Sequence, residues 1–428
     1  MGAKRERYTP NDVGPSPLEW SAPRLSEVST LITNGFVGTA TPFYTDNTGV
    51  PYLYGTNVRA NKLELDTVRY ITKEFHEAQI KTALKPGDLL TVQSGHIGET
   101  AVVTSQLDGA NCHALIVTRL TKEKAYPEYL SYYINSEIGR ARMRGLEVGS
   151  TILHINTKDL KKFRVLLPSI PEQKKIAQIL STWDKAITTT EQLLANSQQH
   201  KKALMQQLLT SKKRLMDKNG VRFSGEWNDV PLNTMAEIIV SPVDKKTEPN
   251  EIPVELCNYT DVYYNHQITK NITFMKATAT KSEIAKYTLN QGDVIITKDS
   301  ETPGDIAVPA FVSEDLKGVV CGYHLAIIRP IIDYLNGAFL NYLFSMQSTR
   351  YYFFTLATGA TRFGLSVGGI NRAQFRVPAL AEQQKIAAVL SAADQEITTL
   401  QQKLDALKQE KRALMQQLLT GKRRVTLN

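Results

Sequence analysis

Two stretches of the chain repeat each other and decide its fold: residues 168–215, PSIPEQKKIAQILSTWDKAITTTEQLLANSQQHKKALMQQLLTSKKRL, and residues 378–425, PALAEQQKIAAVLSAADQEITTLQQKLDALKQEKRALMQQLLTGKRRV. They align without a gap, Glu172 on Glu382, at an offset of 210 positions. Slightly more than half of the aligned residues are identical, and the run ALMQQLLT recurs unchanged between basic residues. Similarity at one fixed offset predicts an internally duplicated architecture.

Each copy is predicted to form one long helix. Pro171 suits a first helical turn, and neither copy contains another glycine or proline before Gly421. The stretch from Glu172 to Arg214, about 43 residues, would be roughly 65 Å long at 1.5 Å per residue. Apolar residues recur in alternating steps of three and four, the spacing of a coiled-coil seam. The stripe consists of Ile176, Leu180, Trp183, Ile187, Leu194, Leu204 and Leu208, and of Ile386, Leu390, Ala393, Ile397, Leu400, Leu404, Leu407, Leu414 and Leu418. Neither helix can bury its stripe alone, so we expect each to pack on the other.

Four polar residues interrupt this stripe: Thr190, Ser197 and Lys201 in the first copy and Lys411 in the second. A polar residue in such a seam often fixes the register of the helices at some cost in stability. A loosely packed stretch, or one that meets a third protein, is an equally good interpretation.

A globular segment precedes each helix, and the two segments resemble each other weakly. The run PGDLL at 86–90 matches QGDVI at 291–295, and KFRV at 162–165 matches QFRV at 374–377, while the loop residues differ. Short apolar runs such as LLTVQS and DVIITKD predict strands, and the stretches 127–144 and 332–354 predict helices. Each segment is therefore expected to be a mixed α and β domain, which makes the chain an α+β protein.

The predicted division of the chain follows from the repeat. It comprises a disordered N-terminal arm (1–17), a first globular domain (18–167), a first helix (168–215), a linker (216–224), a second globular domain (225–377), and a second helix with a tail (378–428).

The charge of the chain favours acidic partners. The formal net charge is +9, and a basic protein tends to bind nucleic acid, although many other proteins are also mildly basic. Residues 171–215 carry eight Lys and Arg against three Asp and Glu, and residues 380–425 carry eight against five, so the excess lies on the helices. Solvated outer faces and contacts to phosphate or a partner subunit are equally good interpretations of these lysines.

Cysteine usage and hydropathy indicate the cytoplasm. Cys112, Cys257 and Cys321 are far apart and form no CxxC pair, which argues against a disulfide framework and a zinc site. No segment approaches the roughly 18 apolar residues that span a membrane.

The sequence carries no motif of a catalytic site. It contains no GxxxxGK[ST] phosphate loop, no GxGxxG turn, no Asn-Pro-Pro-Tyr or Asp-Pro-Pro-Tyr run and no HExxH pattern. We therefore expect a protein that is not itself an enzyme, with no catalytic residues, no metal and no cofactor of its own.

The order of domain, helix, domain, helix resembles the specificity subunit of type I restriction–modification enzymes. The matching residues are Pro168, Pro171-Glu172-Gln173 and Ile176-Ala177 at the helix start, Leu204 to Thr210 (LMQQLLT) at its end, and Gly421-Lys422-Arg423-Arg424-Val425. Ala381 stands where the first copy has Pro171, which is a small departure. The resemblance covers nearly the whole chain, from about Leu18 to Val425.

The resemblance implies a function and a set of partners. Each globular domain would be a target-recognition domain for one half of a bipartite sequence in double-stranded DNA, and the helices would pack antiparallel and set the gap between the halves. Two modification subunits, which bind S-adenosylmethionine and methylate adenine, would dock mainly on the helices. Two ATP- and magnesium-dependent restriction subunits would then join. Because the loops of the two domains differ, we expect an asymmetric target.

Base-reading residues are expected in loops that follow equivalent strands but differ between the domains, because polar side chains on such loops can reach base edges. For each candidate an ordinary turn or capping role is at least as good an interpretation. The candidates are Thr56, Asn57, Arg59, Gln93, Ser94, His96, Thr151 and His154 in the first domain, and Asn258, Thr260, Asp261, Lys298, Asp299, Ser300, Thr361 and Arg362 in the second.

Two other functions compete with this reading. A methyltransferase or nuclease with fused recognition domains would need a catalytic domain, and no stretch is left over to supply one. A coiled-coil scaffold that binds only proteins, without base specificity, has no need of two domains with divergent loops.

Overall fold

The computed structural model describes residues 8–9, 13–14, 16–149 and 153–427, which form two compact units. The first unit combines Met1–Glu191 with Gln402–Asn428, and the second consists of Gln192–Gln401. The boundary falls within both long helices. Each unit therefore contains one globular domain, the start of one helix and the end of the other.

The repeated stretches form the helices α5 (Ile170–Leu208) and α12 (Leu380–Leu418), each 39 residues long. The first helix ends before Arg214, where the sequence predicts its end. The reason is a backbone turn: Ser211 has a φ of +59° and its counterpart Gly421 a φ of +72°, the left-handed conformation that commonly ends helices. The helical parts of the predicted segments 168–215 and 378–428 are correspondingly shorter.

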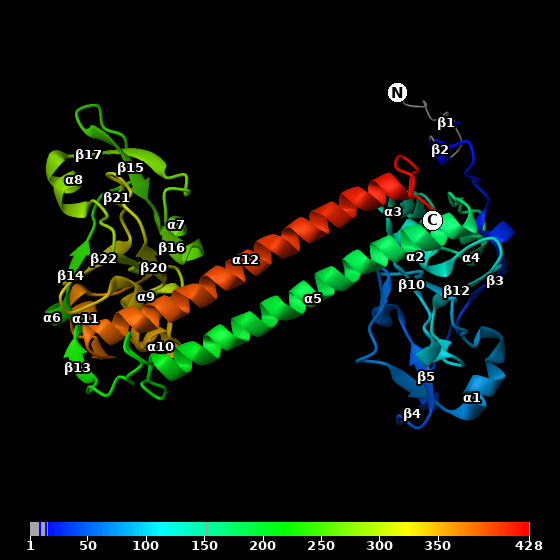
Figure 1. The fold of residues 1–428 in the computed structure, drawn as a ribbon, viewed down its shortest axis with the longest axis horizontal. Helices are drawn as coiled ribbons and strands as arrows, with labels where there is room; N and C mark the ends of the chain where they lie inside the picture. The colour runs from blue at the N-terminus through cyan, green and yellow to red at the C-terminus, as the bar shows by residue number, and fades with distance from the viewer. Residues whose placement is uncertain (1–7, 10–12, 15, 150–152, 428) are drawn as a thin grey trace. The chain divides into compact units, whose positions relative to one another are not determined.

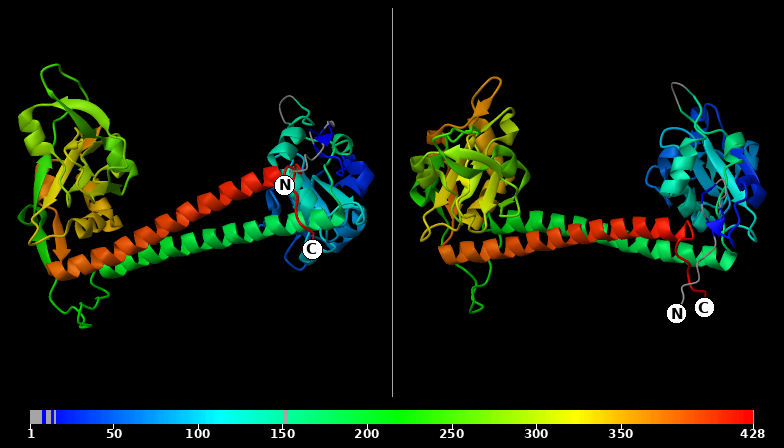
Figure 2. Two further views of the ribbon diagram at one scale, coloured as in Figure 1. Left: turned by 45° about the horizontal axis from the view of Figure 1, so that its top comes forward. Right: turned by 90° about the horizontal axis from the view of Figure 1, so that it is seen from above.

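In each unit the start of one helix lies antiparallel against the end of the other (Figures 1 and 2). The stripe residues that are buried are Ile176, Leu180, Leu194, Leu208, Ile386, Leu390, Leu404 and Leu418. The half-buried ones are Trp183, Ile187, Leu204, Ala393, Ile397, Leu400, Leu407 and Leu414. The predicted packing of the two helices on each other is confirmed.

The polar residues of the stripe have partners, which favours their role in setting the register. Lys411 pairs with Asp184, and at the equivalent place in the second unit Lys201 pairs with Asp394. The other two bond nearby: Ser197 Oγ donates to Glu396 Oε1 (3.0 Å) and Thr190 Oγ1 to the Ala186 carbonyl oxygen (2.8 Å).

An arginine just beyond each helix binds the first turn of the other helix. The Arg214 guanidinium donates to both carboxylate oxygens of Glu382 at 2.6 Å, and Arg424 binds Glu172 in the same way at 2.7 and 2.9 Å. Each guanidinium also lies 6.0 Å from a tryptophan ring centroid, that of Trp227 for Arg214 and that of Trp20 for Arg424. We call Arg424, Glu172 and Trp20 the first clasp, and Arg214, Glu382 and Trp227 the second clasp.

The first domain contains two four-stranded sheets. One has the order β10-β9-β12-β3 and is antiparallel, and the other has the order β11-β5-β8-β4 with β11 and β5 parallel. The strands are β1 (Tyr8–Thr9), β2 (Ser16–Pro17), β3 (Ser29–Asn34), β4 (Tyr44–Thr45), β5 (Val50–Leu53), β6 (Val58–Arg59), β7 (Lys62–Leu63), β8 (Arg69–Ile71), β9 (Leu89–Val92), β10 (Thr100–Val102), β11 (Asn111–Cys112) and β12 (Leu115–Leu120). The helices are α1 (Lys73–Ala78), α2 (Pro127–Asn135), α3 (Glu137–Arg144) and α4 (Thr157–Leu160), with 3₁₀ turns η1 (Leu25–Val28), η2 (Thr41–Phe43), η3 (Gly55–Asn57), η4 (Ile80–Thr82) and η5 (Ser105–Leu107).

The second domain has a five-stranded sheet in the order β14-β22-β18-β20-β16 and a three-stranded sheet in the order β17-β15-β21. The strands are β13 (Asn228–Pro231), β14 (Ala236–Val240), β15 (Ile252–Cys257), β16 (Gln267–Ile268), β17 (Met275–Ala279), β18 (Val294–Thr297), β19 (Asp299–Ser300), β20 (Pro309–Val312), β21 (Val320–Cys321), β22 (Leu325–Pro330), β23 (Phe363–Gly364) and β24 (Gln374–Val377). The helices are α6 (Leu232–Met235), α7 (Tyr259–Tyr264), α8 (Lys281–Tyr287), α9 (Gly337–Ser345), α10 (Gln347–Leu356) and α11 (Val367–Asn371), with η6 (Pro303–Asp305).

The two domains share one frame. The antiparallel order β10-β9-β12-β3 of the first recurs as β20-β18-β22-β14 in the second. The same ion pair between a half-buried arginine and a buried aspartate supports both sheets, Arg119 with Asp88 at 2.7 Å and Arg329 with Asp293 at 2.8 Å. The predicted α+β class and internal duplication are thus confirmed.

The helical stretch expected at 127–144 is two helices, and the one expected at 332–354 begins only at Gly337 and is also two helices. Ser136 separates α2 from α3 with an extended backbone, and its hydroxyl accepts the backbone N–H of Gly139 as an N-cap. Met346 interrupts α9 and α10 in the same way, with φ −66° and ψ 141°.

The expected disorder of residues 1–17 stays a prediction, and the part of this arm that the structure describes contains a short pair of strands. β1 pairs antiparallel with β2, and Ser16 and Pro17 are buried. A Cβ on Gly421 would lie 2.5 Å from Pro17, so the closeness of the arm explains why the second copy has glycine where the first has serine. Among the described helices none is long and apolar enough to cross a membrane.

Candidate nucleic-acid interface

Two of the predicted loops in the first domain are joined by backbone pairing. Ser94, just after β9, forms an antiparallel bridge with His154, and the Ile155 N–H donates to the Gln93 carbonyl oxygen at 2.9 Å. His154 also pairs with Val148. The structure therefore brings together the candidates Gln93, Ser94 and His154, whereas Thr151 lies outside the described residues.

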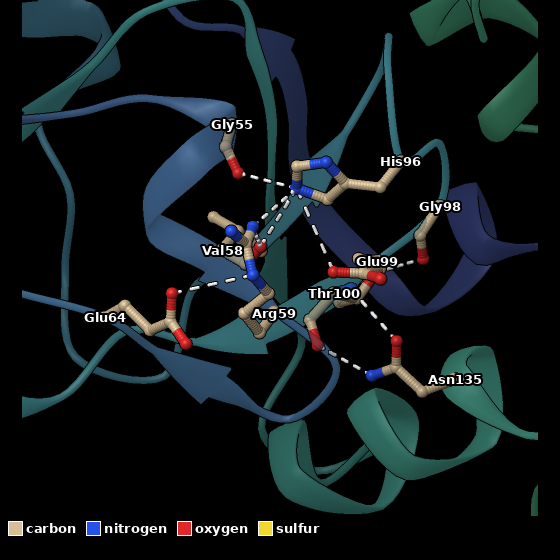
Figure 3. A network of polar contacts seen from close by, with 9 residues as sticks. All are labelled: Gly55, Val58, Arg59, Glu64, His96, Gly98, Glu99, Thr100 and Asn135. Carbon is tan, nitrogen blue, oxygen red and sulfur yellow. Dashed lines mark hydrogen bonds and ion pairs between the residues drawn. The ribbon is translucent and has the colours of Figure 1, made fainter. Parts of the chain in front are cut away.

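A second group in the first domain joins Arg59 of β6 to His96 (Figure 3). His96 Nε2 lies 2.9 Å from the Gly55 carbonyl oxygen and 2.9 Å from an Arg59 guanidinium nitrogen. The ring nitrogen can serve only one of them, because it donates to a carbonyl when protonated and accepts from arginine when not. Arg59 also lies 3.5 Å from Glu64, and two-fifths of its side chain is exposed. The Arg59 guanidinium also donates from Nη1 to the Val58 carbonyl oxygen at 3.1 Å, so this partly exposed side chain is held by several partners.

Asn57 has a structural role in this structure. Its side chain is buried, its oxygen accepts the Tyr54 N–H at 2.8 Å, and its nitrogen donates to the Glu64 carbonyl oxygen at 3.0 Å. Those bonds hold the η3 turn, whereas the neighbouring candidate Thr56 is exposed.

The first domain also has a polar cavity of about 470 Å³. It contains one candidate, His96, together with Arg140 and Arg144 of α3, Glu147 and Leu153. Sequence reasoning missed the two arginines. Their signal was the EIGRARMR run of α3, with arginines at alternating positions.

The loops of the second domain are joined in the same manner. β19, which holds Asp299 and Ser300, pairs antiparallel with β23, and the Leu365 N–H donates to the Lys298 carbonyl oxygen at 2.9 Å. This pairing brings the candidates Lys298, Asp299, Ser300 and Arg362 to one place.

A chain of polar contacts runs through these residues. Lys298 Nζ lies 2.7 Å from Asp299 Oδ1, and His324 Nδ1 lies 3.1 Å from Asp299 Oδ2. The Arg362 guanidinium reaches His324 Nε2 at 2.6 Å. His324, which sequence reasoning missed, precedes β22 and has a φ of +73°. We call Lys298, Asp299, His324 and Arg362 the arginine relay.

The contacts within the relay change the pKa values of His324 and Asp299. Burial lowers the pKa of His324 below 6.5, and the Arg362 charge adds to this, while the hydrogen bond to Asp299 acts against it. Burial would raise the pKa of Asp299, but hydrogen bonds from Lys298 and His324 outweigh it and lower that pKa below 3.8. At neutral pH the His324 imidazole is therefore uncharged, and it lies between the Asp299 carboxylate and the Arg362 guanidinium.

Three members of the relay, Asp299, His324 and Arg362, line a cavity of about 730 Å³ in the second domain. Its wall includes the predicted Thr260 and four tyrosines that sequence reasoning missed, Tyr259, Tyr263, Tyr264 and Tyr323. The run YTDVYY of α7 was the available signal.

Of the remaining candidates, Ser300 belongs to the cavity wall, whereas Asn258, Asp261 and Thr361 do not. The Asn258 N–H donates to Asp261 Oδ2 at 2.8 Å at the start of α7, and burial raises the pKa of Asp261. Ser300 is buried, with its hydroxyl 3.1 Å from that of Tyr259, and Thr361 is exposed. Across the described residues no group of three or more His, Cys, Asp or Glu side chains is placed to hold a metal ion.

The whole chain is similar in sequence to known proteins. The chain is 24% identical over 447 aligned positions to a putative type I restriction enzyme MjaX specificity subunit of Methanocaldococcus jannaschii, covering 99% of this chain and 98% of that protein. It is 22% identical to the type I restriction enzyme StySPI specificity subunit of Salmonella potsdam, over 87% of this chain and 81% of the relative.

Solved structures show the same fold. An HsdS subunit from Thermoanaerobacter tengcongensis matches with a TM-score of 0.50 and 18% identity, over 95% of this chain and 98% of the other. The S subunit of a type I restriction–modification system from M. genitalium matches with a TM-score of 0.57 and 14% identity, over 93% and 96%. The family model for the type I restriction modification DNA specificity domain matches twice, at residues 17–197 and 224–409. The chain therefore belongs to the family of type I restriction–modification DNA specificity subunits.

Proposed function

We propose that the two globular domains read the two halves of a bipartite, asymmetric target in double-stranded DNA. One observation carries the proposal. Both domains present a pair of loops joined by backbone pairing at equivalent strand ends, but the loops carry different side chains, Ser94 and His154 in one and Asp299 and Arg362 in the other. Two domains with the same strand framework but different polar side chains on the loops are suited to recognise two different base sequences.

The long helices would join the two readers and set the gap between the half-sites. Two modification subunits, with S-adenosylmethionine, would dock mainly on the helical regions, and two restriction subunits, with ATP and magnesium, would complete the complex in the cytoplasm. Support comes from relatives named as specificity subunits of restriction enzymes and from the exposed polar faces of α5 and α12. The chain itself would be non-catalytic, and adenine methylation and DNA cleavage would belong to its partners.

The test is genome-wide mapping of methylated adenine in a methylation-free host that carries the full chain with its modification subunit. The expected result is a bipartite, asymmetric motif that disappears when this chain is omitted. If the two proteins are expressed and associated but methylate no defined motif, the proposal fails and the protein-binding scaffold becomes the better account.

A further inference from the structure

We propose that Arg362 reads a guanine in the half-site of the second domain, and that His324, fixed by Asp299, is the positioning residue that aims it. The inference rests on the proposed function and deepens it. It names a base, a reading residue and the groups that hold this residue in place.

The direction of each hydrogen bond in the arginine relay follows from chemistry. A guanidinium only donates, so His324 Nε2 must accept from Arg362, and the proton of the imidazole must then sit on Nδ1 and point to Asp299. Lys298 holds the other oxygen of the same carboxylate. The relay thus fixes both the tautomer and the orientation of His324.

The backbone around Arg362 is fixed as well. The Thr358 and Gly364 backbones pair with each other at the base of this loop. A Cβ on Gly359, whose φ is +146°, would lie 1.9 Å from the Arg362 carbonyl oxygen, so the tight turn requires glycine. His324 also has an unusual positive φ, and residues held in such conformations occur often at binding sites.

Arg362 keeps donors free for a ligand. It is exposed, only one of its guanidinium nitrogens binds His324, and within the described residues no carboxylate forms an ion pair with it. Arginine presents two parallel N–H groups that match O6 and N7 of guanine in the major groove. A pre-aimed side chain loses less entropy when it binds.

The charges around the cavity favour a base edge over a phosphate. Four carboxylates line it, those of Asp244, Asp299, Glu301 and Asp305, against three cationic side chains, those of Lys245, Lys246 and Arg362. A surface that follows the phosphate backbone is expected to be predominantly basic. Carboxylates beside an arginine suit base edges, where they can accept from the cytosine amino group.

The sequence of the first domain does not repeat this arginine at the equivalent position. At the repeat offset, Ile152 occupies the sequence position of Arg362. A contact from this loop position is therefore expected in one half-site only, in keeping with an asymmetric target.

The first experiment measures binding by the full chain assembled with its modification subunit, on duplexes in which each base pair of the mapped target is changed in turn. Arg362→Ala should abolish the preference for one G·C pair, by about 5- to 150-fold, and leave all other positions unchanged. Arg362→Lys should also lack the G·C preference, because the single ammonium group of lysine cannot donate two parallel hydrogen bonds to one guanine. Arg372→Ala, an exposed arginine outside the cavity lining, is the matched control for charge and should change no preference.

A uniform loss of affinity for every sequence, with the salt dependence reduced by about one phosphate contact, would overturn the proposal, because Arg362 would then bind the backbone. Unchanged preferences would also overturn it. Both results can be told apart from a failure of the proposed function, because in that case the wild-type chain itself would give no bipartite motif.

The second experiment tests the role of His324 through pH. The charged groups that face it are Asp299, Arg362 and Lys298. Protonation would remove the acceptor for Arg362 and set two cations against each other, so the G·C preference should fall as the pH drops through the lowered pKa of His324, below 6.5. His324→Asn can keep the positive φ and donate to Asp299, but it is too short to hold Arg362. It should show a weaker G·C preference that does not change with pH, and identical pH profiles for the two proteins would refute the positioning role.

Discussion

The second clasp offers a sharp test of how the helix ends are held. Arg214→Met removes two charge-assisted hydrogen bonds of 2.6 Å to Glu382, whose side chain is only 2% exposed. An unpaired buried carboxylate costs about 3–5 kcal/mol. Because the Arg214 side chain is 19% exposed, water reaches the pair, and we expect the lower end of that range, about 3 kcal/mol.

Hydrogen exchange measured by mass spectrometry on the full chain follows each unit separately. A loss of about 3 kcal/mol should speed exchange in the first turns of α12 by roughly 100-fold, wherever exchange requires that turn to open. The start of α5 should keep its rate, because Arg424 and Glu172 of the first clasp are intact. Arg424→Met is the matched variant and should reverse this pattern.

The double variant Arg214→Met/Glu382→Met separates the net contribution of the ion pair to stability from the free-energy cost of an unpaired Glu382 carboxylate. Replacing a buried ion pair by apolar residues of similar volume is often neutral or stabilising, so exchange should return close to that of the unmodified chain. The reasoning is refuted if Arg214→Met leaves α12 protected, or if the double variant exchanges as fast as the single one.

Three further outcomes are expected. Leu390→Ala should destabilise the second unit by about 2–5 kcal/mol and Leu180→Ala the first by a similar amount, because both side chains are fully buried; urea unfolding measures this, and a change below about 1 kcal/mol in either would contradict the packing. Burial raises the pKa of the Cys112 thiol to about 12, so iodoacetamide at pH 8 should leave it unmodified until urea unfolds the chain, and rapid labelling of the native protein would contradict its burial. The pKa of His324 is lower in the folded state than its ordinary 6.5, so its contribution to stability is complete above pH 6.5 and is lost as the pH falls through the lowered value. His324→Asn should remove this part of the pH dependence in thermal unfolding, and an unchanged dependence would show that another group titrates.

The sequence by itself determined the duplicated architecture and the packing of the helices. A fixed offset of 210 residues, an uninterrupted helical stretch and an apolar stripe are local or periodic features, and they need no knowledge of the fold. The mixed α and β domains follow from the same kind of local signal. The resemblance carried by the helix ends then indicated the family.

Only the tertiary structure decided which loop residues meet. His324 and Arg362 are 38 residues apart in sequence. The pairing of β19 with β23 brings Arg362 to Asp299, and the Lys298 N–H joins His324 to the same place by donating to its carbonyl oxygen at 2.8 Å. Sequence patterns could not distinguish Asn57, which is buried in a turn, from Arg59, whose side chain is two-fifths exposed beside it. Loop contacts depend on strand register and on backbone angles such as the positive φ of His324, and these are set by packing across the whole domain. The C-terminal ends of α5 and α12 also depend on backbone angles, because each helix ends before a residue in the left-handed conformation, Ser211 or Gly421. The periodicity of the apolar stripe does not indicate where these residues end the helix.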